Sequence, residues 1–496
     1  MNVRHCLLVA IAAIQPLAAQ RIPARPLSMP AANPTDAPAG WVKEFGTMWT
    51  FDAPPLAYWK ARYAFTPDQA WLDHVRLASV RIPGCSASIV SANGLVMTNH
   101  HCGRECTAAA SSADSNYIQT GFAAGTLTDE KKCPMLWADQ LISIQDVTAR
   151  VQGSMTAATA AAKVQQRALE IDRLQKECAK DATTLCEVVT FYQGGRYSLY
   201  TYHHFSDVRL VMAPEGDIAF YGGDPDNFTY PRYDLDLTLL RIYDNGQPLH
   251  ARDYLKWSAA GASEGELVFV TGNPGSTGRL LTLAQMEYLR DVDYPNRLAG
   301  YDRMLKAFRA ASAASPDAQR RYQNLIFSYE NSKKAVTGYR VGLVDSSIMA
   351  KKRAFERDFR RRIDADPALK AKYGATWDSI AAAERAQTAL APQLLWPSFG
   401  GGSNLLNWAG IIVRMPGQIA LPDSLRLATF RGSAPQRLRQ AIDTTTVDTT
   451  FERAVLAGTL AAWKASLPAT NPILAAALAY GNGDPDSAAA AIVAQT

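Results

Sequence analysis

The chain has 496 residues, of which 48% are hydrophobic and 20% are charged, and its formal net charge is +5. This length exceeds what one hydrophobic core normally serves, so we expect two domains. The charge is too small for the concentrated basic face of a nucleic-acid-binding protein, so we expect no nucleic-acid partner.

The first twenty residues have the pattern of a secretory signal peptide. Arg4 and His5 precede an apolar run over residues 6–14, and small residues follow it. This order is typical of export signals, and the run is too short to cross a bilayer. We therefore expect residues 1–20 to direct the chain to the periplasm or beyond, with no membrane association after cleavage. Residues 21–40, rich in proline and alanine, should form a flexible lead-in. A buried N-terminal helix is the alternative.

Cysteine usage supports an exported chain. Six cysteines remain once the first twenty residues are removed, and an even number in an exported protein favours disulfides over free thiols. All six lie before residue 190, so we expect the cross-links in the first half of the chain. They are Cys85, Cys102, Cys106, Cys133, Cys178 and Cys186.

From about residue 80 the sequence predicts β-structure. Apolar runs at 86–90 and 95–98 flank Ala92-Asn93-Gly94, and Asn-Gly between such runs is a strong hairpin signal. Residues 156–178 contain no Pro or Gly and are dominated by Ala, Gln, Leu and Glu, which predicts a helix. Further strands are expected at 187–192, 207–213, 237–243 and 267–271.

The composition changes near residue 280. Beyond it the chain is rich in Ala, Arg, Lys, Glu and Leu, and its few prolines suit helix boundaries. A Gly-rich break at 399–403 interrupts this pattern, which then resumes. We predict a mainly β domain over residues 41–280, followed by an α-helical domain over residues 281–496.

The sharpest chemical feature is the run Thr98-Asn99-His100-His101-Cys102, which ends the second strand of the predicted hairpin. A histidine held in place can act as a general base. A pair of surface histidines is the non-catalytic alternative. Zinc is another, because His100, His101, Cys102 and Cys106 are clustered. However, adjacent residues on a strand point to opposite faces, and no second Cys/His pair has zinc-like spacing. We expect neither a metal nor another cofactor.

Residues 221–236 form a second stretch, which is dense in acids and leads into an apolar run. An acid that enters a buried strand is costly unless it is hydrogen-bonded, and a triad histidine would supply that bond. A calcium loop competes, but the EF-hand order of ligands and its closing Glu are absent. Spacing alone leaves four carboxylates open: Asp224, Asp226, Asp234 and Asp236.

Together with four other stretches, these motifs resemble the bacterial dipeptidyl-peptidase 7 and dipeptidyl-peptidase 11 family, exported serine peptidases of the chymotrypsin clan. The stretches keep the family's order. They are residues 46–51 (GTMWTF), 84–106 (GCSASIVSANGLVMTNHHCGREC), 207–215 (DVRLVMAPE), 221–236, 272–279 (GNPGSTGR) and 331–338 (NSKKAVTG). The resemblance implies a chymotrypsin-like double β-barrel with a large helical domain inserted. It also implies a serine-type dipeptidyl peptidase that releases dipeptides from the free N-termini of peptide substrates.

The resemblance assigns catalytic roles to two residues. It makes His101 the general base and Asp236 its orienting acid, because Asp236 follows Pro-Arg-Tyr-Asp-Leu where the family has Pro-Arg-His-Thr-Gly. It also implies a Cys85–Cys102 disulfide that fixes the backbone beside His101. Two further disulfides are expected, Cys178–Cys186 and Cys106–Cys133.

The resemblance also places a binding site for the substrate's amino terminus. Family members use an Asn-Trp pair and an asparagine on a helix for this purpose. The matching positions are Asn227, Phe228 and Asn331, with Arg232 nearby as support. Phe228 stands where tryptophan is usual, which keeps an aromatic wall but removes an indole donor.

One departure concerns the nucleophile. The family carries it in a Gly-Asn-Ser-Gly-Ser-Pro-like motif well beyond the inserted domain, whereas these 496 residues contain no Gly-x-Ser-Gly. The nearest match, Gly275-Ser276-Thr277-Gly278, belongs to a non-catalytic family motif. We expect the chain to stop inside the helical insertion and to lack the serine, the oxyanion hole and the substrate side-chain pocket. The second barrel should also be missing, so we expect an incomplete chymotrypsin-like barrel domain. A catalytically inactive peptide-binding protein is the alternative function, and a metal-dependent hydrolase is a distant one. Whether the family's homodimer forms is left open.

Overall fold

The computed structural model describes residues 48–495 except 113, 135, 274, 276–277, 279, 395–402, 433 and 445–446. The expected signal peptide and lead-in (residues 1–40) and most of the Gly-rich break lie outside the described residues. The chain divides into two compact units. Of the described residues, 48–49 and 53–66 belong to one unit, and 50–52 and those from 67 onward belong to the other. The domain boundary near residue 280 stays a prediction.

The smaller unit contains one described helix, α1 (Leu56–Tyr63). Trp59 of this helix is buried, and its ring centroid lies 5.9 Å from that of Trp49 in an edge-to-face arrangement. Aromatic rings favour this geometry because a positive edge meets a negative face. The contact therefore ties α1 to the residues that precede it.

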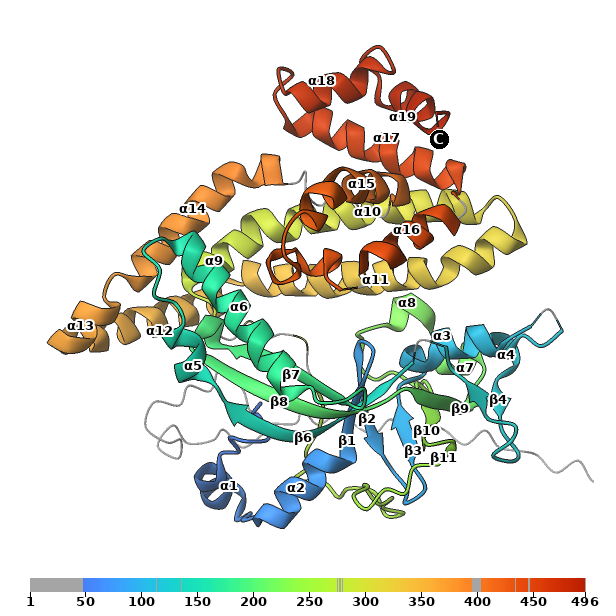
Figure 1. Cartoon of the computed structure of the whole chain (residues 1–496), viewed down its shortest axis with the longest axis vertical. Coiled ribbons are helices and arrows are strands. Elements are labelled where there is room, and N and C mark those ends of the chain that lie inside the picture. Colours follow the sequence, from blue (N-terminus) through green and yellow to red (C-terminus); the bar gives the residue numbers. More distant parts are fainter. Residues whose placement is uncertain are drawn as a thin grey trace, which may run out of the picture. The chain divides into compact units, whose positions relative to one another are not determined.

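The larger unit contains an antiparallel sheet of eleven strands, whose main path runs β4-β9-β10-β3-β2-β1-β6-β8-β7 (Figure 1). The strands are β1 (Ser79–Ile82), β2 (Cys85–Ile89), β3 (Leu95–Thr98), β4 (Phe122–Ala123), β5 (Lys131–Lys132), β6 (Ala138–Asp146), β7 (Thr184–Phe191), β8 (Arg196–Phe205), β9 (Asp207–Ala213), β10 (Thr238–Asp244) and β11 (Gln247–Pro248). Over the described strands, β4 and β7 end the path without pairing to each other, so this sheet is open. The fold is mixed α/β with an antiparallel sheet. The expected chymotrypsin-like barrel, of which the chain should hold an incomplete part, stays a prediction.

Helices precede, interrupt and follow the strands. Those within the first half are α2 (Gln69–Ala78), α3 (His100–Ala110), α4 (Tyr117–Thr120), α5 (Thr148–Gly153), α6 (Ala160–Cys178), α7 (Gly216–Ala219) and α8 (Gly223–Asp226). Those that follow are α9 (Leu283–Tyr288), α10 (Tyr294–Ser312), α11 (Pro316–Val344), α12 (Ser346–Ala365), α13 (Pro367–Tyr373), α14 (Thr376–Leu394), α15 (Asn404–Ile419), α16 (Ala434–Thr444), α17 (Thr449–Ser466), α18 (Pro472–Ala479) and α19 (Pro485–Val493). No helix among the described residues is both long and apolar enough to cross a bilayer.

The expected hairpin is present as β2 and β3, in which Ser88 pairs with Met97. The turn requires glycine at position 94, where φ is +70° and a Cβ atom would lie 2.9 Å from the carbonyl oxygen of Ile242. Only glycine adopts this backbone region without cost. The predicted helix is α6, and three of the other predicted strands are β7, β9 and β10.

The strand predicted at 267–271 is wrong. These residues pair with no strand among those described, and the Val270 side chain is 98% exposed. An apolar, β-branched sequence becomes a strand only where a neighbouring strand can complete its hydrogen bonds. The sequence pattern showed the propensity of this segment and could not show whether a partner was present.

The core of the sheet is formed where the hairpin strands β2 and β3 pack with β9 and β10. Fully buried aliphatic side chains from four strands pack there, among them Ile89, Val96, Leu210 and Leu240. Burying each such side chain contributes about 1.5–3 kcal/mol. This core therefore holds the ends of β3 and β10 in place, and the candidate site lies directly beyond those ends.

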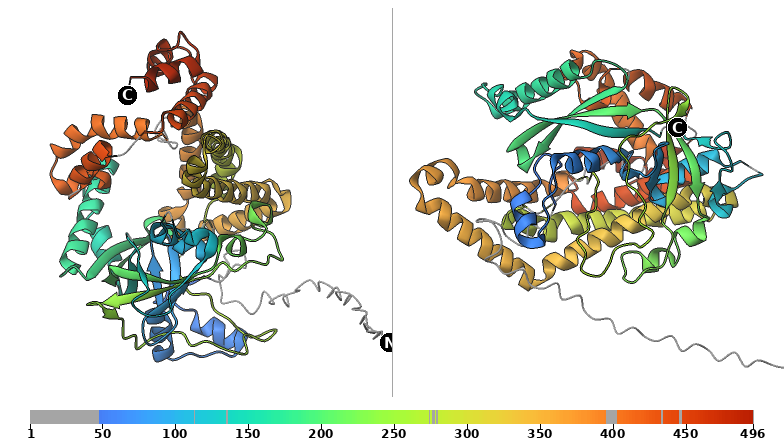
Figure 2. Two further views of the ribbon diagram at one scale, coloured as in Figure 1. Left: turned by 90° about the vertical axis from the view of Figure 1, so that its right-hand side faces the viewer. Right: turned by 90° about the horizontal axis from the view of Figure 1, so that it is seen from below.

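The helices of the second half have cores of their own. α10 and α11 lie side by side (Figure 2). Phe308 of α10 stacks on Phe451 of α17 with ring centroids 5.0 Å apart. The composition change near residue 280 thus marks a real change in secondary structure, since all of the described elements from α9 onward are helical.

Candidate active site

The two adjacent histidines begin a helix. β3 ends at Thr98 and α3 starts at His100, so the premise that both rings lie on a strand is wrong. Successive side chains on a helix are rotated by about 100°. His100 accordingly points inward and is 3% exposed, whereas the His101 side chain is 66% exposed. The two rings are still kept apart, by helix rotation instead of strand alternation.

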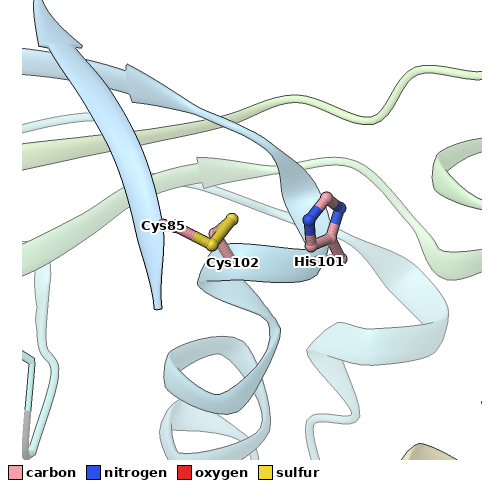
Figure 3. Close-up of side chains that lie close together, drawn as sticks. All are labelled: Cys85, His101 and Cys102. Atoms are coloured by element: carbon pink, nitrogen blue, oxygen red, sulfur yellow. A yellow bond between two sulfur atoms is a disulfide. The ribbon is translucent and has the colours of Figure 1, made fainter. Parts of the chain in front are cut away.

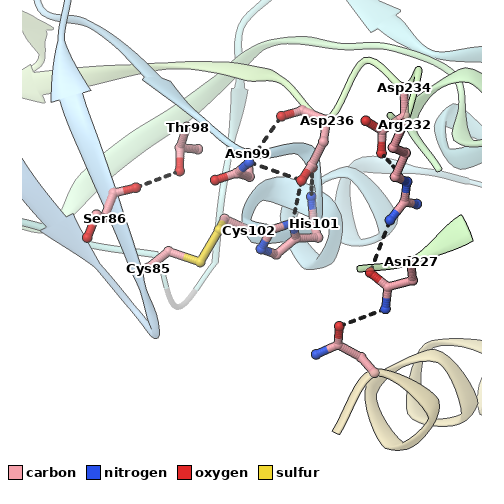
Figure 4. A network of polar contacts seen from close by, with 11 residues as sticks. Cys85, Ser86, Thr98, Asn99, His101, Cys102, Asn227, Arg232, Asp234 and Asp236 are labelled. Carbon is pink, nitrogen blue, oxygen red and sulfur yellow. Dashed lines mark hydrogen bonds and ion pairs between the residues drawn. A yellow bond between two sulfur atoms is a disulfide. The ribbon is translucent and has the colours of Figure 1, made fainter. Parts of the chain in front are cut away.

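The Asp236 carboxylate holds the His101 ring. His101 Nδ1 lies 2.8 Å from Asp236 Oδ2, and the His101 backbone N–H donates to Oδ1 at 3.1 Å (Figure 4). The Asn99 amide nitrogen also donates to Oδ2 at 3.0 Å. A carboxylate only accepts hydrogen bonds, so Nδ1 carries a proton and the lone pair of neutral His101 is on Nε2. Of the four carboxylates that spacing left open, the structure brings Asp236 to His101.

The pKa values of the two residues move in opposite directions. The hydrogen bond that His101 donates to Asp236 raises the pKa of His101, and burial opposes this rise only in part. Burial acts to raise the pKa of Asp236, but the hydrogen bonds from His101 outweigh it and the pKa is lowered. The neighbouring His100 differs, because burial, followed by the charge of Arg104, lowers its pKa. Of the two adjacent histidines, His101 is therefore the stronger base.

We expect the substitution Asp236→Asn to lower the pKa of His101, because it removes the charge and the acceptor that raise it. The pKa of His101 is higher in the folded chain than in the unfolded chain. The His101–Asp236 pair therefore stabilises the fold at pH values below the unfolded pKa of His101, and this contribution is lost as pH rises through the folded pKa. Histidine NMR titration measures the shift, with His101→Ala to assign the signal. Asp226→Asn is the matched control and should leave the pKa unchanged. A His101 pKa that is the same in Asp236→Asn and the wild type would contradict the prediction.

A disulfide joins β2 to α3 beside His101. Cys85 and Cys102 form this bond, with their Cα atoms 6.2 Å apart (Figure 3). The structure also pairs Cys106 with Cys133 and Cys178 with Cys186, as expected. The sulfur atoms of the first disulfide and the His101 ring lie within 4.8 Å of one another. They do not fit a metal site, because metal ligation requires thiolates and these sulfurs are bonded to each other.

Glycine at position 103 lets α3 approach β10. A Cβ atom there would lie 2.7 Å from Thr238 Cγ2, closer than side-chain carbons occur. Thr238 begins β10, two residues after Asp236. The close approach therefore sets the spacing between the helix that carries His101 and the segment that carries Asp236.

Three of the four residues expected at the substrate's amino terminus form one network. Asn227 Nδ2 donates to Asn331 Oδ1 at 3.0 Å, and Arg232 Nη1 donates to Asn227 Oδ1 at 3.0 Å (Figure 4). Arg232 Nε also lies 3.1 Å from Asp234 Oδ2. Phe228 takes no part in these hydrogen bonds; its side chain is 63% exposed and its φ is +61°. A positive φ in a bulky residue is strained, which is a common feature of ligand sites.

Sequence reasoning missed two residues of this region. Asn99 supports the Asp236 carboxylate, and Lys334 of α11 donates to the carbonyl oxygens of Asp224 and Pro225, at 3.2 Å for the latter. Asn99 lies inside the histidine motif and Lys334 inside the 331–338 stretch, so both belong to motifs that the sequence analysis identified without assigning them a role. Their roles depend on contacts across more than 100 residues, which no local pattern shows.

The chain's family follows from comparison with known proteins. The model of the family described as Peptidase S46 matches residues 44–496. The chain belongs to the peptidase S46 family. Among curated relatives, it is 30% identical over 312 residues to the dipeptidyl-peptidase 7 of Porphyromonas endodontalis, covering 58% of this chain and 38% of that protein. It is also 30% identical over 294 residues to the Asp/Glu-specific dipeptidyl-peptidase of Flavobacterium psychrophilum, covering 57% of this chain and 41% of that protein.

Solved structures share the fold of this chain. The crystal structure of Porphyromonas endodontalis DPP11 in complex with the dipeptide Arg-Glu matches with a TM-score of 0.67 at 23% identity, covering 84% of this chain and 62% of that chain. A second structure of the same protein, in complex with substrate, also has a TM-score of 0.67. The match with this S46 chain spans 38% and 41% of the length of the two curated relatives named above.

Proposed function

We propose that this S46 chain carries the base and the orienting acid of a serine-type dipeptidyl peptidase, which releases dipeptides from the free N-termini of peptides. The observation that carries the proposal is the 2.8 Å contact between His101 Nδ1 and Asp236 Oδ2. It fixes the ring and leaves Nε2 to accept a proton from a nucleophile, which is the geometry of a triad base. The Asp236 charge would also stabilise the imidazolium that then forms.

The Asn227–Asn331 pair supports the same proposal. Each side-chain amide offers a carbonyl oxygen, and such oxygens accept hydrogen bonds from an ammonium group. Arg232 donates to Asn227 and holds it in place. Phe228, the next residue along the chain, is exposed and would supply an apolar wall. Selectivity for a free amine is what limits a peptidase to cleavage near the N-terminus. We therefore propose that peptides with a free N-terminus are the substrates.

The proposal includes an export route and a larger barrel. Disulfides form in oxidising compartments, and all six cysteines of residues 48–495 are paired. This supports export to the periplasm or beyond by residues 1–20. We propose that the open sheet is part of a chymotrypsin-like barrel, and that residues 281–496 belong to an inserted helical domain.

A second candidate function is peptide binding without catalysis. It is favoured by one observation: within the described residues, the His101 ring makes a hydrogen bond only with Asp236, and none with a hydroxyl group. We propose that the nucleophilic serine is not among the 496 residues. Reading the coding sequence beyond residue 496 separates the two candidates. An in-frame Gly-x-Ser-Gly would support the enzyme, and its absence would support the binding protein.

Binding of peptide amines tests the part of the proposal that both candidates share. A panel of dipeptides that differ in side chains, including Arg-Glu, should bind in the free form and not when N-acetylated. Asn331→Ala should weaken free-amine binding about tenfold or more, because a hydrogen bond to a charged group is lost. Isothermal titration calorimetry measures both.

Asn324→Ala is the matched control, since Asn324 is an exposed asparagine of the same helix. It should bind like the wild type. Equal affinity for free and acetylated dipeptides in the wild-type protein would overturn the amine-binding proposal.

A further inference from the structure

Four side chains form a continuous stack next to the candidate site. The Arg104 guanidinium carbon lies 5.0 Å from the centroid of the Phe327 ring, and the Phe327 and Phe220 centroids are 5.1 Å apart. The Arg232 guanidinium carbon lies 5.0 Å from the Phe220 centroid. Both outer contacts are in the range of cation–π attraction, and the inner one is a tilted aromatic pair. We call Arg104, Phe327, Phe220 and Arg232 the guanidinium–ring stack.

Arg104 is a partly buried member of this stack. Burial lowers the pKa of its guanidinium. Its Nε atom is buried and has no hydrogen-bond partner among the described residues, which also give it no carboxylate within ion-pair distance. Desolvating a cation is costly unless something compensates for the lost water, and the face of Phe327 is the compensation that the described contacts provide. We therefore expect Arg104 to contribute to the relative position of the elements that it contacts more than to the stability of the fold.

The stack joins the two parts of the candidate site. Arg104 lies three residues after His101 on α3, and Phe327 lies four residues before Asn331 on α11, so each is one turn from a site residue. At the far end, Arg232 donates to Asn227, which donates to Asn331 (Figure 4). The contacts thus close a ring that contains the proposed amine-binding pair, and Arg104 joins this ring to the helix that carries the proposed base.

A dipeptidyl peptidase must hold the substrate's amine at a fixed distance from its base, because that distance selects the second peptide bond. We infer that Arg104, Phe220 and Phe327 are positioning residues that fix α11, and with it Asn331, at a set distance from the helix that carries His101. This inference rests on the proposed function for its purpose, but the fixed spacing itself is a physical property that can be measured alone. Lys334 of α11 also donates hydrogen bonds to carbonyl oxygens of α8, so α11 is attached a second time to the segment that carries Asn227.

The spacing is tested by spin labels on α3 and α11. Glu105→Cys and Leu325→Cys provide exposed labelling positions, and pulsed electron resonance measures the distribution of distances between them. We expect one narrow distribution in the otherwise wild-type chain. Phe327→Leu should broaden it at least twofold, because the leucine fills the space without a π face. Phe327→Tyr keeps the ring and should restore the narrow distribution.

The same variants are compared in dipeptide binding. Phe327→Leu should weaken binding of free-amine dipeptides about fivefold or more, and Phe327→Tyr should bind within twofold of the wild type. Phe359→Leu, which removes a phenylalanine of α12 outside the stack, is the matched control for general loss of packing. If Phe327→Leu lowers the melting temperature as Phe359→Leu does but leaves the distance distribution and the affinity unchanged, the positioning role is refuted.

The amine-binding proposal and the inference about the stack can be overturned separately. A wild-type chain that does not distinguish free from acetylated dipeptides overturns the amine-binding proposal, and the distance distributions then decide the stack without it. A wild-type chain that distinguishes them, with Phe327→Leu identical to it in spacing and affinity, leaves the amine site standing and overturns the inference about the stack.

Discussion

Purified as 496 residues, the chain is expected to show no hydrolysis of dipeptidyl fluorogenic substrates that depends on His101. A triad base has nothing to activate without a nucleophile, and loss of the triad serine alone removes on the order of 10⁶-fold in rate. The only side-chain hydrogen bond of the His101 ring among the described residues is the one with Asp236, and no Gly-x-Ser-Gly occurs in the sequence. A fluorophore-release assay over a panel of dipeptides measures this.

The control is a His101→Ala version prepared in the same way. Turnover in the wild type that vanishes in His101→Ala would show that a nucleophile is present and was missed. Equal background in both proteins agrees with the prediction, provided that circular dichroism shows helix and sheet in each. A longer version of the chain that contains an in-frame Gly-x-Ser-Gly should gain activity, and His101→Ala should abolish it.

The largest loss of stability is expected from Glu130→Ala. Glu130 and Arg241 form a buried ion pair at 2.8 Å, with side chains 2% and 10% exposed, between β10 and the turn before β5. Tyr243 also donates to Glu130, at 2.8 Å. Removing one partner of a buried pair leaves the other charge uncompensated, which costs about 3–5 kcal/mol. Urea denaturation followed by circular dichroism measures the change.

Two comparisons identify the cause. Glu187→Ala removes an equally short but half-exposed contact with Arg81, and such pairs are worth about 0–1 kcal/mol. The double variant Glu130→Leu/Arg241→Met removes both charges together and should recover much of the loss, because no lone charge remains. A Glu130→Ala protein no less stable than Glu187→Ala would show that Arg241 finds another partner or water.

Local patterns in the sequence predicted the parts of the fold that are decided locally. Asn93-Gly94 predicted the hairpin because only a glycine fits its turn, and the absence of Pro and Gly predicted α6. The cysteine pairs and the choice of Asp236 depended on family resemblance, since spacing left four carboxylates open. The structure shows why spacing could not decide between them. Asp224, Asp226 and Asp234 are about as far from His101 in sequence as Asp236 is, and the approach of α3 to β10 brings Asp236 to the His101 ring.

The features that escaped prediction are those decided by distant partners. His100 and His101 follow a strand, and nothing local shows that a helix begins there. Residues 267–271 have strand propensity but no partner strand among those described. Arg104 and Phe327 are ordinary helix residues in sequence, and their contact joins positions more than 200 residues apart. Such contacts appear only when the chain is folded, because no periodicity encodes them.

Gly103 has a consequence for how this chain can vary. Because a methyl group at that position would collide with Thr238, even the smallest substitution must push α3 away from β10. The carboxylate of Asp236 is two residues from Thr238, so the displacement would be passed directly to the 2.8 Å contact with His101. If position 103 were replaced by every amino acid in turn, only glycine should therefore preserve the hydrogen bond between His101 and Asp236. The neighbouring Glu105, which faces solvent, should tolerate nearly every residue.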